Sequence, residues 1–279
     1  MRDAAEISVY KTRSVRILRK CYESPAKVTE NSPPAIEIRE LQKRYSGVLA
    51  VRGFSFSLAR GEVLGLLGGN GAGKTTTIGM IMGLVLPSAG SVKVFGIDMA
   101  KDRYAVLPRM NFESPYVDMP HRLTVRQNLE VFGRLYGVQN IKKRIIELAR
   151  ELHLEEFLDR ESGALSAGQK TRIALAKSLI NEPDLLLLDE PTASLDPDTA
   201  DWVRTRLETY RKAHGASILL ASHNMAEVER LCDRVIIMKA GTIADEGTPQ
   251  NLIERYGRHS LEEVFLDVAR APATQGTAA

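Results

Sequence analysis

The sequence predicts an α/β fold: a mainly parallel sheet flanked by helices, with a helical subdomain inserted into it. Three observations lead to this prediction. Short apolar, strand-like runs recur between residues 36 and 238. One of them, EVLGLLG at 62–68, passes directly into a glycine-rich turn and then into a helical pattern at 74–84. The stretch 101–164 carries mostly helical patterns, and the helix that follows extends this block to about residue 182.

The predicted strands are short apolar runs bounded by polar or glycine-containing turns. In chain order they lie at 35–41, 51–59, 62–68, 91–95, 184–188, 216–221 and 234–238. Four consecutive leucines at 185–188 suit a strand that is buried on both faces of a parallel sheet. The helices of the inserted block are predicted at 124–138 and 141–154.

Composition excludes several classes of protein. The 279 residues include 38 Lys and Arg against 35 Asp and Glu, and this weak excess of positive charge does not indicate nucleic-acid binding. No apolar run approaches the roughly 18 residues of a membrane-spanning helix, and the N-terminus has no apolar signal-peptide core. The two cysteines, Cys21 and Cys232, lack metal-ligand spacing.

The two ends of the chain differ from its centre. Residues 1–34 form a basic N-terminal extension that ends near the Pro33-Pro34 pair, and its KTRSVRILRK segment has five basic residues and no acidic one. Two interpretations stay open for it: a flexible, solvated tail, or a segment that contacts an anionic membrane surface or a partner. Residues 258–279 are expected to form a helix and then a disordered, Ala-rich tail.

The glycine-rich turn has the spacing of a phosphate-binding loop, G-x-x-x-x-G-K-[ST]. It reads GGNGAGKTT and consists of Gly68, Gly69, Asn70, Gly71, Ala72, Gly73, Lys74, Thr75 and Thr76. Glycines allow backbone N–H groups to curl around phosphate oxygens. Lys74 can reach the β- and γ-phosphates, and the Thr75 hydroxyl can ligate magnesium. The alternative is a turn with a purely structural role. The position of this turn between a strand and a helix favours phosphate binding.

Two acidic residues follow the four leucines. Asp189 comes at the carboxyl end of the predicted strand, where open α/β sheets bind ligands, and its carboxylate can hold magnesium. Glu190 comes next and can orient or activate the water that attacks the γ-phosphate. The alternative is that both residues belong to a strand-end turn before Pro191.

His223 and Ser166 each allow two interpretations. His223 follows the apolar run ending at residue 221, so it reaches the same sheet edge as Lys74 and Glu190, where it can contact the γ-phosphate or the attacking water. A structural histidine is the alternative. Ser166 opens the amphipathic stretch LSAGQKTRIALAKSL, as a simple N-cap or as part of a helix N-terminus that holds phosphate.

With these motifs in order, residues 36–269 resemble the nucleotide-binding subunits of ATP-binding cassette (ABC) transporters. The signature of that family is LSGGQ, and this chain has LSAGQ. The resemblance implies a P-loop NTPase core with an antiparallel β subdomain, spanning residues 35–257. It also implies that two copies meet head to tail around two ATP molecules, so that Ser166, Gly168 and Gln169 of one copy face the phosphate bound by the other.

Further residues acquire roles through the resemblance. Tyr45 matches the aromatic residue that stacks on adenine, the alternative being a strand-end tyrosine. Asp189 and Glu190 match the magnesium-binding aspartate and the catalytic glutamate, and His223 matches the switch histidine. The loop after Glu190, formed by Ser194, Leu195 and Asp196, matches the segment that links the two sites across the dimer.

The chain departs from the family pattern at three positions. Ala167 replaces the first glycine of the LSGGQ signature, and Gly69 replaces a common proline in the phosphate loop; we expect both changes to be tolerated. Glu113 is the nearest match to a glutamine that senses magnesium, and its carboxylate is a hard oxygen donor for that ion.

The C-terminal part, from GTIADEG to SLEEVFLDVA, looks like that of ATPase subunits serving exporters of drugs, polysaccharides or lipid-linked material. The resemblance therefore implies an ATP- and magnesium-dependent ATPase that powers export through a separate integral membrane permease, from the cytoplasmic, inner face of the cell membrane. No nucleic-acid partner is expected. Two alternatives remain: a soluble ABC ATPase acting in translation or DNA repair, and a regulatory subunit that binds ATP without hydrolysing it.

Overall fold

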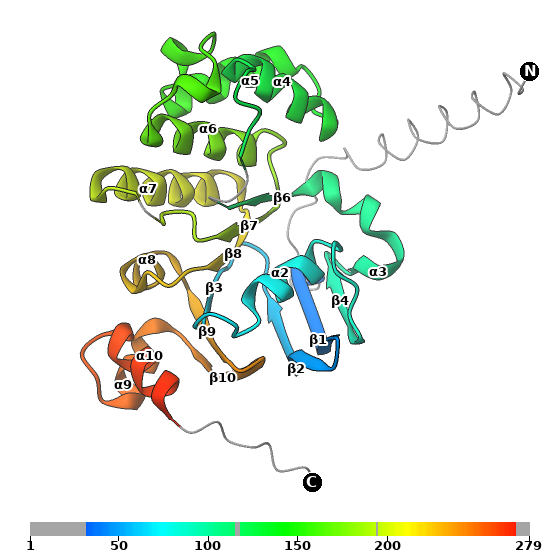
Figure 1. Cartoon of the computed structure of the whole chain (residues 1–279), viewed down its shortest axis with the longest axis vertical. Helices are drawn as coiled ribbons and strands as arrows, with labels where there is room; N and C mark the ends of the chain where they lie inside the picture. The colour runs from blue at the N-terminus through cyan, green and yellow to red at the C-terminus, as the bar shows by residue number, and fades with distance from the viewer. Residues whose placement is uncertain (1–31, 115–117, 194, 272–279) are drawn as a thin grey trace, which may run out of the picture.

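The computed structural model describes residues 32–114, 118–193 and 195–271 (Figure 1). The N-terminal extension up to residue 31, with Cys21, lies outside the described residues. The same holds for Ser194 and for the Ala-rich tail at 272–279. None of the helices in the described ranges has the length and apolar character needed to cross a bilayer.

The centre of the molecule is a mainly parallel sheet. Within the described residues its six strands run in the order β10-β9-β3-β8-β7-β6. They are β3 (Val63–Leu67), β6 (Met110–Glu113), β7 (Leu185–Asp189), β8 (Ser217–Ala221), β9 (Arg234–Lys239) and β10 (Thr242–Gly247). Only β10 pairs antiparallel in this sheet. Every residue of β3, β7 and β8 is buried, which confirms the prediction made from the four leucines.

Alternate residues of these strands enter two different cores. Leu64, Leu185 and Leu187 pack toward the antiparallel sheet and α2, whereas Leu186 and Leu188 pack toward the helical layer. A strand sends successive side chains to opposite faces, so a run of leucines serves both cores at once. The continuous apolar composition of the strand is thus a direct consequence of its central position.

A second sheet is antiparallel and has the order β2-β1-β4-β5. Its strands are β1 (Ile36–Tyr45), β2 (Val48–Leu58), β4 (Ala89–Val94) and β5 (Ile97–Asp98). The fold class, with its antiparallel β subdomain, is therefore confirmed. Phe95, which the sequence predicts as the last residue of this strand, has φ of 53° and lies just beyond the end of β4.

The helices surround the two sheets (Figure 1). They are α2 (Lys74–Ile81), α3 (Met99–Asp102), α4 (Val125–Leu135), α5 (Ile141–Leu152), α6 (Ala167–Leu179), α7 (Pro197–His214), α8 (Met225–Leu231), α9 (Pro249–Tyr256) and α10 (Leu261–Arg270). Helices α4, α5 and α6 form a layer at the top of Figure 1. The range 101–182 is not helical throughout, because β6 lies within it and pairs with β7 in the main sheet.

A bulge in β1 requires a glycine in the neighbouring strand. The pairing of β1 shifts register on both of its sides around Glu40, whose φ is 45°. Gly90 of β4 lies against this bulge with φ of +81°, and a Cβ there would stand 2.2 Å from the carbonyl oxygen of Glu40. Only glycine avoids both the unfavourable φ and the steric overlap.

We expect Gly90→Ala to destabilise the fold. The left-handed φ alone costs about 1–2 kcal/mol for an alanine, and the overlap with the backbone of β1 adds to that cost. Gly47→Ala is the matched control, because Gly47 has φ of +91° but open space around its Cβ position. Urea unfolding should give a larger loss for Gly90→Ala; equal losses would mean that the bulge relaxes without cost.

Candidate functional site

The phosphate loop joins β3 to α2. Gly71 and Gly73 have φ of 78° and 103°, which side-chain-bearing residues rarely adopt. Gly68 is confined for a different reason, since a Cβ there would stand 2.7 Å from the Cβ of Ala72. The Lys74 ammonium folds back and donates to the carbonyl of Gly68 over 2.5 Å. The side chain of Lys74 thus bonds to the backbone of its own loop.

The first turn of α2 has no side-chain cap. Its N-cap residue is Gly73, and no side-chain oxygen accepts from the first N–H groups of the helix. By contrast, side chains of Thr124, Ser166 and Asp196 cap α4, α6 and α7. Free N–H groups and the positive end of the helix dipole are available for an anion at α2.

Asp189 and Glu190 lie at the carboxyl end of β7, as predicted. Asp189 is buried, and this burial raises the pKa of its carboxyl; the charge of Glu190 acts in the same direction, while that of Lys74 lowers the pKa. Glu190 has φ of 57°, a left-handed conformation that is unusual for a residue with a side chain. Its N–H is fixed by the carbonyl of Ala221 over 2.8 Å.

His223 is held directly against Glu190. Its Nδ1 lies 2.6 Å from Oε2 of Glu190, and its backbone N–H donates to the same oxygen over 3.2 Å. The imidazole is exposed, whereas the Glu190 side chain is largely buried. The structure therefore brings together Lys74, Asp189, Glu190 and His223 at one sheet edge.

The start of α6 is organised as an N-cap. The Ser166 hydroxyl accepts from the N–H of Gln169 over 3.3 Å, and Oε1 of Gln169 accepts from the N–H of Ser166 over 3.0 Å. A Cβ on Gly168 would come within 3.4 Å of the Thr199 hydroxyl, at the start of α7. Within one chain, Ser166 and Gln169 thus bond to each other, and Gly168 lies beside the start of α7. Ser166 is exposed.

Two other predicted residues lie away from these contacts. Tyr45 ends β1 with its side chain 44% exposed, and Lys43 lies 4.9 Å from the centre of its ring. Glu113 ends β6, opposite Leu188 of β7. Its Oε2 lies 2.8 Å from Nζ of Lys177, and both side chains are buried. Within the described ranges, no hydrogen bond or ion pair joins Glu113 to the phosphate loop.

Burial dominates the electrostatics of Glu113. It raises the pKa of the carboxyl, against the opposing effects of the Lys177 charge and of hydrogen bonds from Lys177 and the Ser114 backbone. Nearby, Asn111 donates to Oδ1 of Asn181 over 2.8 Å and to the carbonyl of Lys177 over 3.2 Å. These polar contacts attach α6 to the edge of the main sheet. A magnesium-binding role for Glu113 stays a prediction, and one that would compete with this ion pair.

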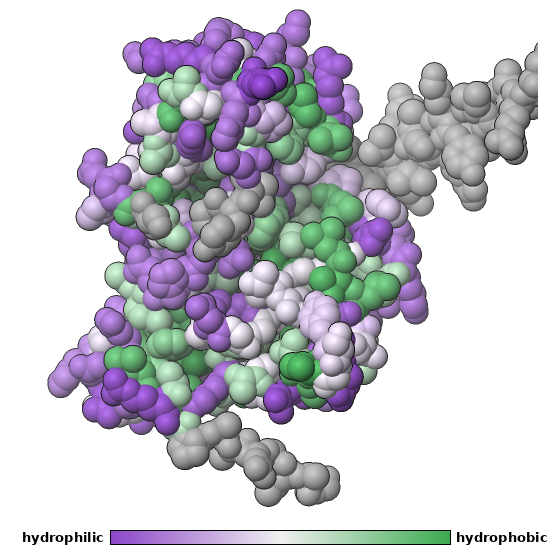
Figure 2. All heavy atoms as spheres, in the orientation of Figure 1, coloured by the Kyte–Doolittle hydropathy of each residue, from purple (hydrophilic) through white to green (hydrophobic). Residues whose placement is uncertain are grey.

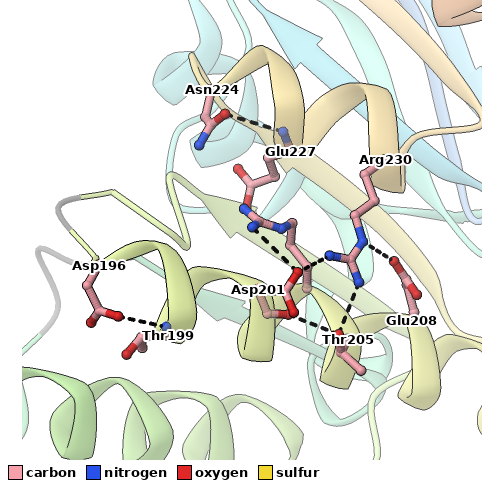
Figure 3. Close-up of polar contacts among 9 residues, drawn as sticks. Asp196, Thr199, Asp201, Thr205, Glu208, Asn224, Glu227 and Arg230 are labelled. Atoms are coloured by element: carbon pink, nitrogen blue, oxygen red, sulfur yellow. Dashed lines mark hydrogen bonds and ion pairs between the residues drawn. The ribbon is translucent and has the colours of Figure 1, made fainter.

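Sequence reasoning missed a buried acid near the site. Glu227 of α8 is 0% exposed, and its Oε2 accepts from the Ser222 hydroxyl over 2.6 Å. Asn224 caps α8 by accepting from the N–H of Glu227 (Figure 3). The Asn-x-x-Glu spacing at the start of α8 could have indicated a helix N-terminus, but not the burial of this acid.

Helices α7 and α8 are joined by a charged cluster. Figure 3 shows Arg230 of α8 reaching Asp201, Thr205 and Glu208 of α7. Asp196 caps α7 in the loop that follows Glu190, by accepting from the N–H of Thr199 over 3.0 Å. The loops that carry Glu190 and His223 therefore lead into two helices that are tied together.

A phosphate loop, a buried aspartate and a Glu–His pair on a parallel sheet define a nucleotide-binding ATPase. Comparison with known proteins identifies its family: residues 51–193 match the ABC transporter family. Nod factor export ATP-binding protein I of Ralstonia nicotianae is 38% identical over 248 residues, which cover 88% of this chain and 77% of that protein. Its counterpart in Rhizobium sp. (strain N33) is 39% identical over 84% of this chain and 77% of that protein.

Solved structures agree with this assignment. An ATP-binding subunit of an ABC transporter matches with a TM-score of 0.77 and 28% identity, over 84% of this chain and 99% of that one. The cbiO1 protein of Clostridium perfringens, part of the ABC transporter complex cbiONQ, matches with a TM-score of 0.71 and 30% identity, over 86% and 96% of the two chains. The chain belongs to the ABC transporter family, and it is an ATP-binding subunit and an ATPase.

We expect Lys177→Met to destabilise the fold strongly, because it leaves the Glu113 carboxyl buried without its cation. Breaking a buried pair in this way costs about 3–5 kcal/mol. The loss should shrink as pH falls, because a raised pKa means that Glu113 takes up a proton readily and then carries no unpaired charge.

Urea unfolding at two pH values measures this effect. The double variant Glu113→Gln/Lys177→Met should recover much of the loss, since it removes both charges. Lys143→Met is the control, because that lysine is exposed on α5 and its ion pair with Glu147 is 3.5 Å long. A Lys177→Met protein as stable as the wild type would show that the ion pair contributes nothing to the fold.

Proposed function

We propose that Glu190, positioned by His223, activates water for ATP hydrolysis, and that two copies of this chain close around two ATP molecules to drive export through a separate membrane permease. The observation that carries this proposal is the Glu190–His223 contact at the sheet edge where the uncapped α2 begins. This arrangement supports Glu190 as a proton acceptor at the same sheet edge as a helix terminus that can bind phosphate.

The roles of individual residues follow from their chemistry. Lys74 and the free N–H groups of α2 neutralise phosphate charge, which phosphoryl transfer requires. The Glu190 carboxylate accepts a proton from the attacking water, and His223 fixes the orientation of that carboxylate. The exposed ring of Tyr45 offers an apolar face on which adenine stacks.

Magnesium fits the donors present. The Thr75 hydroxyl and the Asp189 carboxylate are hard oxygen ligands of the kind this ion prefers. Burial raises the pKa of Asp189, so a nearby cation would favour the charged form that ligates it. When bound, magnesium supplies charge neutralisation at the β- and γ-phosphates. Thr75 and Asp189 are the residues we assign to it; Glu113 is a weaker candidate because Lys177 already pairs with it.

The signature residues are assigned to the second copy. The contacts of Ser166 and Gln169 lie within α6, which occupies a different layer from α2 (Figure 1). The exposed start of α6 offers N–H groups and the positive end of a helix dipole to a phosphate. In a head-to-tail dimer, the start of α6 would complete the nucleotide site of the other copy with these N–H groups and this dipole.

An exposed apolar patch supports a membrane partner. Leu84, Leu86 and Tyr104 are 76%, 60% and 67% exposed. Leu86 also lines a hollow of about 350 Å³ between the end of α2, β4 and α3. Figure 2 shows hydrophobic side chains gathered over this part of the surface. Large exposed apolar patches mark interaction sites, and we assign this one to the permease, on the inner face of the cell membrane.

Export is proposed as the direction of transport. The similar proteins from Ralstonia and Rhizobium are named as Nod factor export ATP-binding proteins. The C-terminal elements β10, α9 and α10 cover the stretch whose sequence looks like that of exporter subunits.

Glu190→Gln should bind ATP but lower kcat by about 10²–10⁴-fold, because the amide cannot accept the proton of water. It should accumulate as an ATP-bound dimer in size-exclusion chromatography. Lys74→Ala should instead lose ATP binding and stay monomeric. Glu156→Gln, at an exposed position, is the control with wild-type turnover. Normal hydrolysis by Glu190→Gln would refute its role as the base.

Tagged Glu190→Gln protein, purified from membranes of the native source with ATP and magnesium present, should bring a stoichiometric multi-spanning membrane protein with it. A Leu84→Glu/Leu86→Glu variant in the same background should lose that protein but keep the ATP-dependent dimer. Leu266→Glu, on α10, is the control. Recovery with ribosomes, with DNA or with no partner would favour the soluble ATPase instead.

A further inference from the structure

Glu227 is a fully buried acid that lies between two loops. It is 0% exposed, and its Oε2 accepts from the buried Ser222 hydroxyl over 2.6 Å. The Thr192 hydroxyl is close enough to the carboxyl to favour its charged form. Oε1 is nevertheless buried without a hydrogen-bond partner in the described part of the chain. A buried polar atom of this kind calls for an explanation.

The two loops are those of the proposed catalytic pair. Ser222 immediately precedes His223, and its hydroxyl also accepts from the N–H of Asn224 over 3.1 Å. Thr192 follows Glu190 by two residues, in the tight turn where the N–H of Ala193 donates to the Glu190 carbonyl over 3.0 Å. One carboxyl therefore interacts with both loops.

The net effect of the surroundings is to raise the pKa of the Glu227 carboxyl above its ordinary value. Burial raises the pKa of Glu227, and the charge of Glu190 raises it further; Ser222, Thr192 and Arg204 lower it. Desolvation is the largest of these effects. A protonated carboxyl has one O–H donor in addition to its acceptors, so Oε1 can donate while Oε2 accepts from Ser222.

The helix that carries Glu227 is itself fixed. Arg230, one turn later on α8, bonds to Glu208 over 2.8 Å and to the Thr205 hydroxyl over 3.0 Å, and it pairs with Asp201 (Figure 3). All three partners belong to α7, which starts beyond the loop of Glu190. Glu227 thus projects from a rigid support rather than from a mobile loop.

We propose that Glu227 is a positioning residue that fastens the Thr192 loop to the Ser222 loop and so sets the Glu190–His223 contact, without itself touching ATP. The inference rests on the proposed roles of Glu190 and His223. Glu190 needs such support, since its left-handed backbone is unfavourable by about 1–3 kcal/mol and persists only where its surroundings hold it.

The test compares three variants of the full chain. Glu227→Ala should lower kcat by about 10- to 100-fold, the loss expected when catalytic groups move by a fraction of an ångström to about 1 Å, and leave ATP affinity unchanged. Glu227→Gln should restore most of kcat, because an amide both donates and accepts. Glu229→Gln is the matched control two residues along α8, where Oε1 of Glu229 accepts from the N–H of Leu261 over 2.7 Å.

The pH dependence of kcat separates positioning from simple packing. As pH rises through the raised pKa, Glu227 loses its proton, loses its donor and repels Glu190, so wild-type kcat should fall over that pH range. Glu227→Gln should lack that fall, because its amide does not titrate. The other ionisable groups that interact electrostatically with Glu227 are Glu190, Arg204 and Cys232, and they are the same in both proteins. Burial raises the pKa of Cys232 above its ordinary value.

Ser222→Ala and Thr192→Val provide a second route if Glu227→Ala does not fold. Each removes one loop partner of Glu227 and should lower kcat with unchanged ATP affinity. The inference is overturned if Glu227→Ala keeps wild-type kcat, or if Glu227→Gln is as impaired as Glu227→Ala with an unaltered pH profile. Normal hydrolysis by Glu190→Gln would instead refute the proposed function, whatever the Glu227 variants do.

Discussion

The register of three buried parallel strands is the constraint on which the site depends. Leu66 of β3 and Asp189 of β7 both stand opposite Ala221 of β8, so the three strands end at the same level. The phosphate loop, the acidic pair and the His223 loop then emerge side by side. Each strand packs into both cores, so a shift of one residue would exchange the side chains of the two faces and move Asp189 out of line with Leu66.

Several locally unfavourable features gather at this edge. The start of α2 has no side-chain cap, Asp189 is a buried acid, and Glu190 has a left-handed backbone. Elsewhere the chain follows the usual rules, with capping boxes on α4 and α6. Departures from local rules tend to concentrate at functional sites. The uncapped start of α2 suits a bound anion and the buried Asp189 suits a bound cation, so these features point to the site independently of sequence similarity.

The parts of the fold that sequence could predict are those set by neighbouring residues. The phosphate loop, Asp189 and Glu190 can be recognised because their functional residues occur in short motifs with fixed spacing. The roles of Lys177 and Glu227 could not be predicted from the sequence, because they depend on contacts that form only when the chain folds. Lys177 lies on α6 and pairs with Glu113 across a long stretch of chain. The strand β6 was hidden within a mostly helical block, because four residues carry too weak a period to stand out.

Helix α6 connects the signature to the nucleotide edge of the same chain. The LSAGQ segment, in which Ser166 is exposed and Leu165 is buried, forms its N-terminus. Lys177 near its end pairs with Glu113, which stands opposite the residue preceding Asp189. At 1.5 Å per residue, its 13 residues span about 20 Å. A displacement of α6 must either carry β6 with it or separate a buried ion pair. Separation is costly in a desolvated setting, so the helix and the edge of the sheet move most easily as one unit. In the proposed dimer, the signature that faces the second copy would thereby be mechanically coupled to the strand beside the first copy's own Asp189.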